Sequence, residues 1–133
     1  EDWFSNAAWL SNETECDWRS QLSVEEICIE GRYTKISLPA NNLVGTLPNE
    51  LAFMTDLVGL SLPYNGLTGS IPSQLESCTD MREIYLFSNA LTGLVPSTLG
   101  LLMKLEDLSL FSNAFTAKFP STLGLLLSFI PTL

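Results

Sequence analysis

The chain has 133 residues, of which 46% are hydrophobic and 16% are charged. This composition indicates one ordered, packed domain and argues against a disordered segment. Because 15 acidic and 6 basic residues give a net charge of −9, the surface repels phosphate backbones, and no nucleic-acid binding is expected. The longest apolar stretch, residues 123–133, is shorter than the roughly 18 residues of a membrane span. We therefore expect no membrane insertion by this segment.

Residues 1–32 come first in the chain and are rich in tryptophan. Trp3, Trp9 and Trp18 supply apolar surface, together with Leu10. The segment precedes a stacked array of repeats, whose first unit would otherwise expose one whole apolar end. We therefore expect residues 1–32 to form an N-terminal cap.

A phrase of 24 residues follows and occurs four times without gaps. The four repeats span residues 33–56, 57–80, 81–104 and 105–128. A fixed period of this length is typical of stacked-repeat proteins, and apolar residues alternating over 57–62 predict a short strand in each repeat. Because a 24-residue unit cannot bury its own apolar face, the repeats are expected to stack side by side into a solenoid.

Aligning the four repeats produces columns that each hold one type of residue. Four apolar columns predict the core: Leu38, Leu62, Leu86 and Leu110; Leu43, Leu67, Leu91 and Phe115; Leu47, Ile71, Val95 and Phe119; Leu51, Leu75, Leu99 and Leu123. An asparagine column predicts an internal ladder that satisfies the backbone groups of the turns: Asn41, Asn65, Asn89 and Asn113. A glycine column predicts positive φ or close backbone approach: Gly45, Gly69 and Gly93, with Ala117 in the fourth repeat. A proline column predicts an extended outer segment: Pro48, Pro72, Pro96 and Pro120.

The repeat phrase L-x-x-L-x-L-x-x-N-x-L-T-G-x-I-P-x-x-L, present in full in residues 57–75, resembles the plant-type leucine-rich repeat. The resemblance covers residues 33–128. It implies a leucine-rich repeat solenoid: a right-handed curved β-solenoid with a parallel concave sheet, 24-residue repeats and an N-terminal capping helix region. Similar repeats occur in extracellular proteins of plants and in algal proteins.

The resemblance extends into the cap, where Trp9-Leu10 and Cys16-Asp17-Trp18 are similar to the W-L pair and the C-x-W motif of the family. The family closes its cap with a second cysteine, which implies a disulfide between Cys16 and Cys28. In the chain-entropy account such a loop contributes about 3 kcal/mol, and the bond forms only in an oxidising compartment. The alternative is two reduced thiols in a cytosolic protein. The sequon at Asn12 favours secretion and makes Asn12 the expected glycosylation site.

No residue pattern predicts catalysis, a metal or a cofactor. Cys78 falls in an apolar column, and the chain has no histidine that would take a proton from a nucleophilic thiol. Three cysteines without histidine do not supply a plausible zinc site. The neighbouring carboxylates Glu25-Glu26 and Glu106-Asp107 are interpreted as solvated or cross-strand charges rather than as an acid and a base. We therefore expect a protein that is not an enzyme.

Side chains between the leucines of each predicted strand project from the concave face. Aromatic and charged residues gather there, and the candidate ligand-binding residues are Tyr64, Arg82, Glu83, Tyr85, Phe87, Glu106, Asp107, Ser109 and Phe111. Exposed aromatics flanked by charges have the composition of a binding hot spot. The alternative is an aromatic ladder that only covers the sheet, with Phe87 stacked on Phe111.

The resemblance implies a recognition module for a protein, a peptide or a glycan, at the cell surface or outside the cell after passage through the secretory pathway. One role is a ligand-binding fragment of a receptor-like protein whose full-length form is attached to a membrane. A second role is a secreted inhibitor of a cell-wall hydrolase, similar to polygalacturonase inhibitors. A third is a structural or adhesive spacer.

Residues 129–133 begin a fifth repeat that the chain does not complete. Pro131 falls where a central strand would need a backbone N–H, and no polar C-terminal cap follows. An uncapped stack exposes an apolar end. This pattern predicts either a fragment of a longer protein or self-association through the uncapped C-terminal end.

Overall fold

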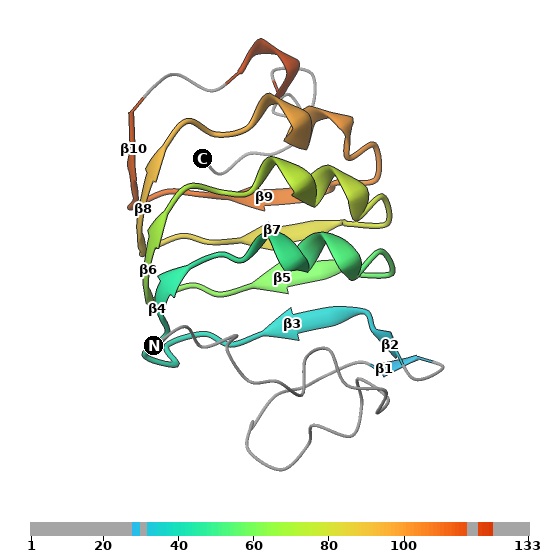
Figure 1. The fold of residues 1–133 in the computed structure, drawn as a ribbon, viewed down its shortest axis with the longest axis horizontal. Coiled ribbons are helices and arrows are strands. Elements are labelled where there is room, and N and C mark those ends of the chain that lie inside the picture. Colours follow the sequence, from blue (N-terminus) through green and yellow to red (C-terminus); the bar gives the residue numbers. More distant parts are fainter. Residues whose placement is uncertain (1–27, 30–31, 117–119, 124–133) are drawn as a thin grey trace.

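A computed structural model describes residues 28–29, 32–116 and 120–123 of the chain (Figure 1). Side chains are described from Thr34 to Thr116 and for Pro120, Ser121 and Leu123. Most of the predicted cap therefore lies outside the described residues, including Asn12 and Cys16, and so does the C-terminal stub. Of the cap, the structure shows β1 (Cys28–Ile29) paired antiparallel with β2 (Arg32–Tyr33). The disulfide and the glycosylation site remain predictions.

Each repeat begins with a strand of a four-stranded parallel sheet, which we call the concave sheet. Its strands, in order, are β3 (Lys35–Ser37), β5 (Gly59–Ser61), β7 (Glu83–Tyr85) and β9 (Asp107–Ser109). Gly59 pairs with Lys35 on one side and with Glu83 on the other, so paired residues lie one sequence period apart. The predicted parallel sheet is confirmed.

A second four-stranded parallel sheet was not predicted. Its strands are β4 (Val44–Thr46), β6 (Gly66–Gly69), β8 (Ala90–Gly93) and β10 (Ala114–Phe115). Figure 1 shows these strands along one side of the stack, each following a strand of the concave sheet in its own repeat. Here Thr46 pairs with Thr68, so the register differs from that of the concave sheet.

The third part of each repeat is a short 3-10 helix that follows the proline column. These helices are η3 (Asn49–Phe53), η4 (Ser73–Ser77), η5 (Ser97–Leu101) and η6 (Ser121–Leu123). The prolines before the first three are extended, as predicted, with φ and ψ of −76° and 146° at Pro48. In each helix a buried leucine donates its backbone N–H to the carbonyl of that proline, as Leu75 does to Pro72. The proline thus starts the helix without a lost donor.

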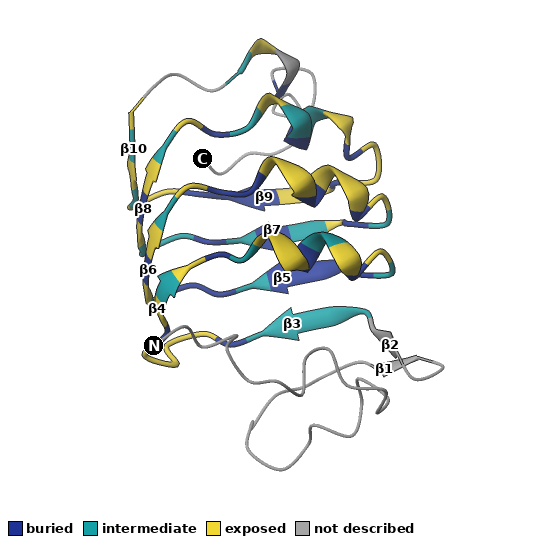
Figure 2. Cartoon of the chain, viewed as in Figure 1, coloured by how far each residue is buried: buried dark blue, intermediate teal, exposed yellow. Residues whose placement is uncertain are grey.

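The core lies between the concave sheet and the 3-10 helices, and it is built from the predicted leucine columns (Figure 2). Leu62, Leu86 and Leu99 are fully buried, whereas Phe115 in the fourth repeat is only partly buried. Cys78 is also fully buried, and burial raises the pKa of its thiol to about 11. It therefore stays protonated, as expected for an apolar column. Among the described residues, no helix is long and apolar enough to cross a membrane.

Candidate functional site

The asparagine ladder holds the turns that follow the concave strands. Asn89 donates from Nδ2 to the carbonyl oxygens of Leu62 and Leu86, at 2.9 and 3.1 Å, and its Oδ1 accepts the backbone N–H of Leu67 at 3.1 Å. Asn65 and Asn113 make the equivalent bonds. The predicted ladder is confirmed for these three residues. Each asparagine completes the turn of the preceding repeat as well as its own.

The residue before each asparagine has a left-handed backbone, a feature that sequence reasoning missed. The four positions are Ala40, Tyr64, Ser88 and Ser112, with φ from 49° to 57°. This conformation is uncommon for residues other than glycine, and for a bulky side chain it is an outlier. Tyr64 adopts it at a φ of 57° and is 62% exposed. Because all four repeats share this conformation, it belongs to the turn after each concave strand, and at Tyr64 it places an aromatic side chain next to Phe87.

Three aromatic side chains form a ladder across neighbouring repeats. The ring centroids of Phe87 and Phe111 lie 4.6 Å apart with an angle of 13° between the planes, so the predicted stack is present. Tyr64 meets Phe87 nearly at right angles, with 5.2 Å between the centroids. Phe111 at the end of the ladder is 44% exposed. The rings therefore pack on one another and still present apolar surface to solvent.

Ion pairs fix the charged side chains at the other end of the strands. Arg82 Nη1 lies 2.5 Å from Glu106 Oε1, a pair between adjacent strands, as predicted. Lys35 Nζ lies 2.7 Å from Glu83 Oε2, although β5 separates their strands. The crossing is possible because the residue between them is Gly59, where a Cβ would meet Lys35 Cγ at 3.2 Å. Sequence reasoning missed this pair. The signal that could have found it is the glycine at the equivalent position of the repeat between Lys35 and Glu83.

Tyr85 links the charged and aromatic parts of the face. Partial burial raises the pKa of its phenol, and the nearby charges of Asp107 and Glu83 raise it further. The phenol therefore stays neutral at neutral pH. Asp107 itself is exposed.

Of the nine candidate ligand-binding residues, eight are exposed or half-buried, and Ser109 is the exception. Ser109 is only 6% exposed, so the expectation that its side chain lies open on the concave face is wrong. Its side chain is short, it is the last residue of β9, two residues from both Asp107 and Phe111, and it pairs with Tyr85. Larger neighbours therefore shield it. The other eight residues are brought together on one face by β7, β9 and the turns that follow the concave strands.

The outward-facing residues of the second sheet differ in residue type from those of the concave face. Eleven exposed positions form what we call the second-sheet face: Asn42, Val44, Thr46, Gly66, Thr68, Ser70, Ala90, Thr92, Leu94, Ala114 and Thr116. None of these is charged and none is aromatic. Residues of the types that dominate binding hot spots are therefore found on the concave face and not here.

The concave face combines aromatic side chains with paired charges. Glu83 and Glu106 each form an ion pair with a basic side chain. Within the described part of the chain, no three His, Cys, Asp or Glu side chains are grouped closely enough to hold a metal ion. The arrangement offers rigid apolar edges beside fixed charges.

Comparison with known proteins finds relatives among solved structures, while no family model and no curated protein matches the chain. PEPR1, solved with AtPEP1, is 39% identical over 68% of this chain and 13% of its own, with a TM-score of 0.66. The Arabidopsis receptor kinase HAESA, solved with the peptide hormone IDA and the co-receptor SERK1, is 32% identical over 75% of this chain and 17% of its own, with a TM-score of 0.71.

A plant ice-binding protein is also similar, at 28% identity over 74% of this chain and 31% of its own, with a TM-score of 0.66. The chain thus spans less than a third of the length of each of these proteins. Because neighbours with one fold differ in what they bind, the fold alone does not decide the function. The repeat phrase, the two parallel sheets and these neighbours together identify the chain as a plant-type leucine-rich repeat protein, the class that includes extracellular receptor-kinase ectodomains.

Proposed function

We propose that the chain is a ligand-recognition segment of an extracellular or cell-surface protein, and that it binds a protein or peptide on its concave face. The observation that carries the proposal is the aromatic ladder of Tyr64, Phe87 and Phe111, exposed at both ends and flanked by fixed ion pairs. Two of the structural neighbours are receptors solved with AtPEP1 or with a peptide hormone, which supports the same kind of partner here.

The rigidity of the face favours binding. Backbone pairing holds the strands, and the asparagine ladder holds the turns, so little conformational entropy is lost when a ligand docks.

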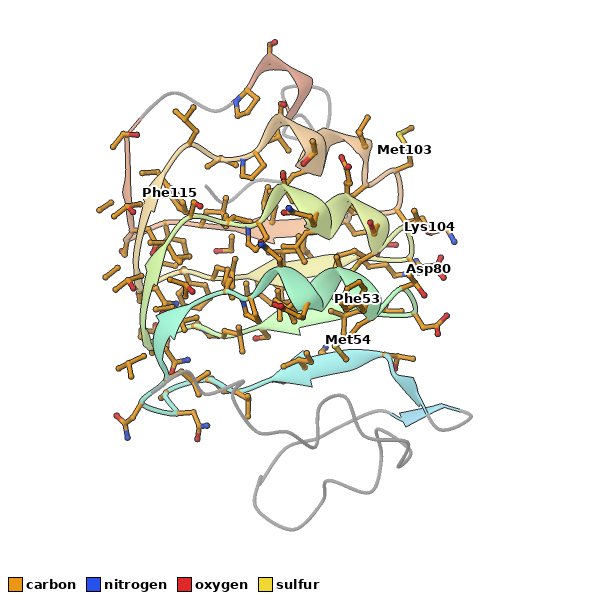
Figure 3. All side chains as sticks on the ribbon, in the orientation of Figure 1. Phe53, Met54, Asp80, Met103, Lys104 and Phe115 are labelled. Carbon is orange, nitrogen blue, oxygen red and sulfur yellow. The ribbon has the colours of Figure 1, made fainter. Side chains whose placement is uncertain are left out.

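A peptide display library selected on the full chain tests the proposal, because such a selection works without a known ligand. We expect binders whose affinity falls about 30-fold in the Phe87→Ala variant, the effect of removing a hot spot worth about 2 kcal/mol. The matched control is Phe53→Ala, which removes a phenylalanine that is 77% exposed on η3 (Figure 3). Equal losses in the two variants, or no binders at all, would contradict the proposal.

The hydrolase-inhibitor alternative uses the same face and therefore needs its own assay. Inhibition of a purified polygalacturonase by the chain, lost in Phe87→Ala, would favour that role over a peptide receptor. Self-association through the residues after Leu123 stays a proposal, which light scattering of the same preparation tests. A spacer role would be supported if neither a peptide nor a hydrolase bound.

A further inference from the structure

The charges on the concave face do not balance. Its charged side chains are Lys35, Arg82, Glu83, Glu106 and Asp107. The two basic residues are each bound to a glutamate, in the pairs Lys35–Glu83 and Arg82–Glu106. The remaining carboxylate, that of Asp107, is exposed and forms no ion pair with a basic side chain of the described residues. The face therefore carries an acidic group whose charge no basic side chain of the described face neutralises.

Asp107 lies within reach of exposed apolar surface. It is on β9, four residues before Phe111, and alternate residues of an extended strand point to the same side. Residues four apart in extended backbone are separated by about 13 Å. Between them lies Ser109, whose side chain is short and buried. An extended segment along β9 can therefore place one side chain at Asp107 and a second, four residues away, at Phe111.

The net charge of the whole chain also favours a cationic ligand at long range. Its net charge of −9 attracts cations and repels anions over the distance of a Debye length, which raises the association rate of a basic ligand. A carboxylate-rich ligand would meet both this field and the unneutralised Asp107.

We propose that the ligand of the concave face is a cationic peptide segment, which places a lysine or arginine against Asp107 and an apolar side chain against Phe111. The inference rests on the proposed function and names the chemistry of its partner. An extended peptide that satisfies both contacts carries its basic and apolar residues four positions apart.

The peptide display selection, repeated on designed variants, tests this assignment. Peptides selected on the wild-type chain should be basic, with lysine or arginine four positions from an apolar residue. Asp107→Asn should weaken a selected peptide about five- to tenfold, as expected for a charge pair at an exposed interface. The matched control is Glu76→Gln, which changes the net charge equally but lies exposed on η4 and should change affinity less than twofold.

A change in the peptide supplies a second measurement, made on both the wild-type chain and Asp107→Asn. Replacing the selected lysine with norleucine should weaken binding to the wild-type chain, but should have little effect on binding to Asp107→Asn. If Glu76→Gln weakens binding as much as Asp107→Asn, the attraction is to net charge and the assignment to Asp107 is wrong. If the selected peptides are neutral or acidic, the cationic ligand is wrong while the proposed function stands. If no peptide binds, the proposed function itself fails.

Discussion

The two parallel sheets are built from the same four repeats and flank the same core, yet their exposed residues differ. In the concave sheet paired residues are 24 apart, as in Lys35 with Gly59, whereas in the second sheet they are 22 apart, as in Thr46 with Thr68. The column directly before the concave strands changes chemistry from repeat to repeat: Thr34, Val58, Arg82 and Glu106. The corresponding second-sheet column barely changes: Val44, Thr68, Thr92 and Thr116.

The difference follows from the space available at each sheet. In the second sheet a Cβ at Gly69, where φ is +73°, would lie only 2.9 Å from Thr46 Cγ2. Glycine satisfies that geometry, and substitution at this position is costly. In the concave sheet long side chains extend outward, so their identity is free to specify a partner. A repeat protein can therefore vary its recognition surface without disturbing its stacking.

The largest expected effect comes from the residue that joins the two sheets. Asn89→Leu removes the partners of buried backbone groups at Leu62, Leu86 and Leu67. We expect the free energy of unfolding to fall by about 3 kcal/mol, because each unsatisfied buried group costs about 1–3 kcal/mol. Urea denaturation measures the change. Asn49→Leu, at an exposed position in η3, should stay within about 0.5 kcal/mol of the wild type. Similar losses in both variants would show that the ladder contributes little.

The next prediction separates two reasons for glycine at Gly69 and Gly93 in the second sheet, which are a positive φ and a lack of space for a Cβ. Gly93→Ala should cost about 1 kcal/mol for its positive φ, since the new Cβ would meet only Ser70 Cβ at 3.5 Å. Gly69→Ala should cost about 2 kcal/mol, because the clash with Thr46 Cγ2 is added. In the Thr46→Ser background, which lacks that methyl group, the cost at Gly69 should fall to that at Gly93. A double-mutant cycle by denaturation measures this, and an unchanged cost would rule out the steric account.

A smaller effect concerns the crossing ion pair of the concave sheet. A double-mutant cycle on Lys35 and Glu83 should give a coupling of about 0.5 kcal/mol, because both side chains are about one-third exposed. In a Gly59→Val background the coupling should vanish, since a side chain there would occupy the path of Lys35. Coupling that persists in this background would mean that the lysine reaches Glu83 by another route.

The smallest effect is a pH dependence at Tyr85, whose pKa is raised by partial burial and by the neighbouring carboxylates. In the unfolded chain the pKa of a tyrosine is about 10, which is below the pKa of Tyr85 in the folded chain. Stability is therefore lost as the pH rises above about 10, through preferential ionisation of the unfolded chain. The difference in ultraviolet absorbance between the wild type and Tyr85→Phe gives the titration. Asp107→Asn should lower the pKa of Tyr85, and an unchanged value would argue against the contact between the two side chains.

Sequence columns could predict whatever recurs with the 24-residue period. The buried leucines, the asparagine ladder and the positive φ of Gly69 and Gly93 all belong to this class, because one residue type recurs where one geometry recurs. The second sheet escaped prediction because its paired residues lie 22 apart rather than 24, and the Lys35–Glu83 pair escaped because it passes over the intervening repeat. Ser109 was placed wrongly for a related reason, since its burial depends on the size of its neighbours.

The direction of the asparagine ladder has a consequence for how the protein is made. Asn65, Asn89 and Asn113 each reach back to the preceding repeat, so no turn is complete until the next asparagine has been synthesised. On a ribosome, which releases the N-terminal part first, each repeat must wait for the arrival of its successor. The nascent solenoid is therefore expected to close in steps, always one repeat behind the emerging chain.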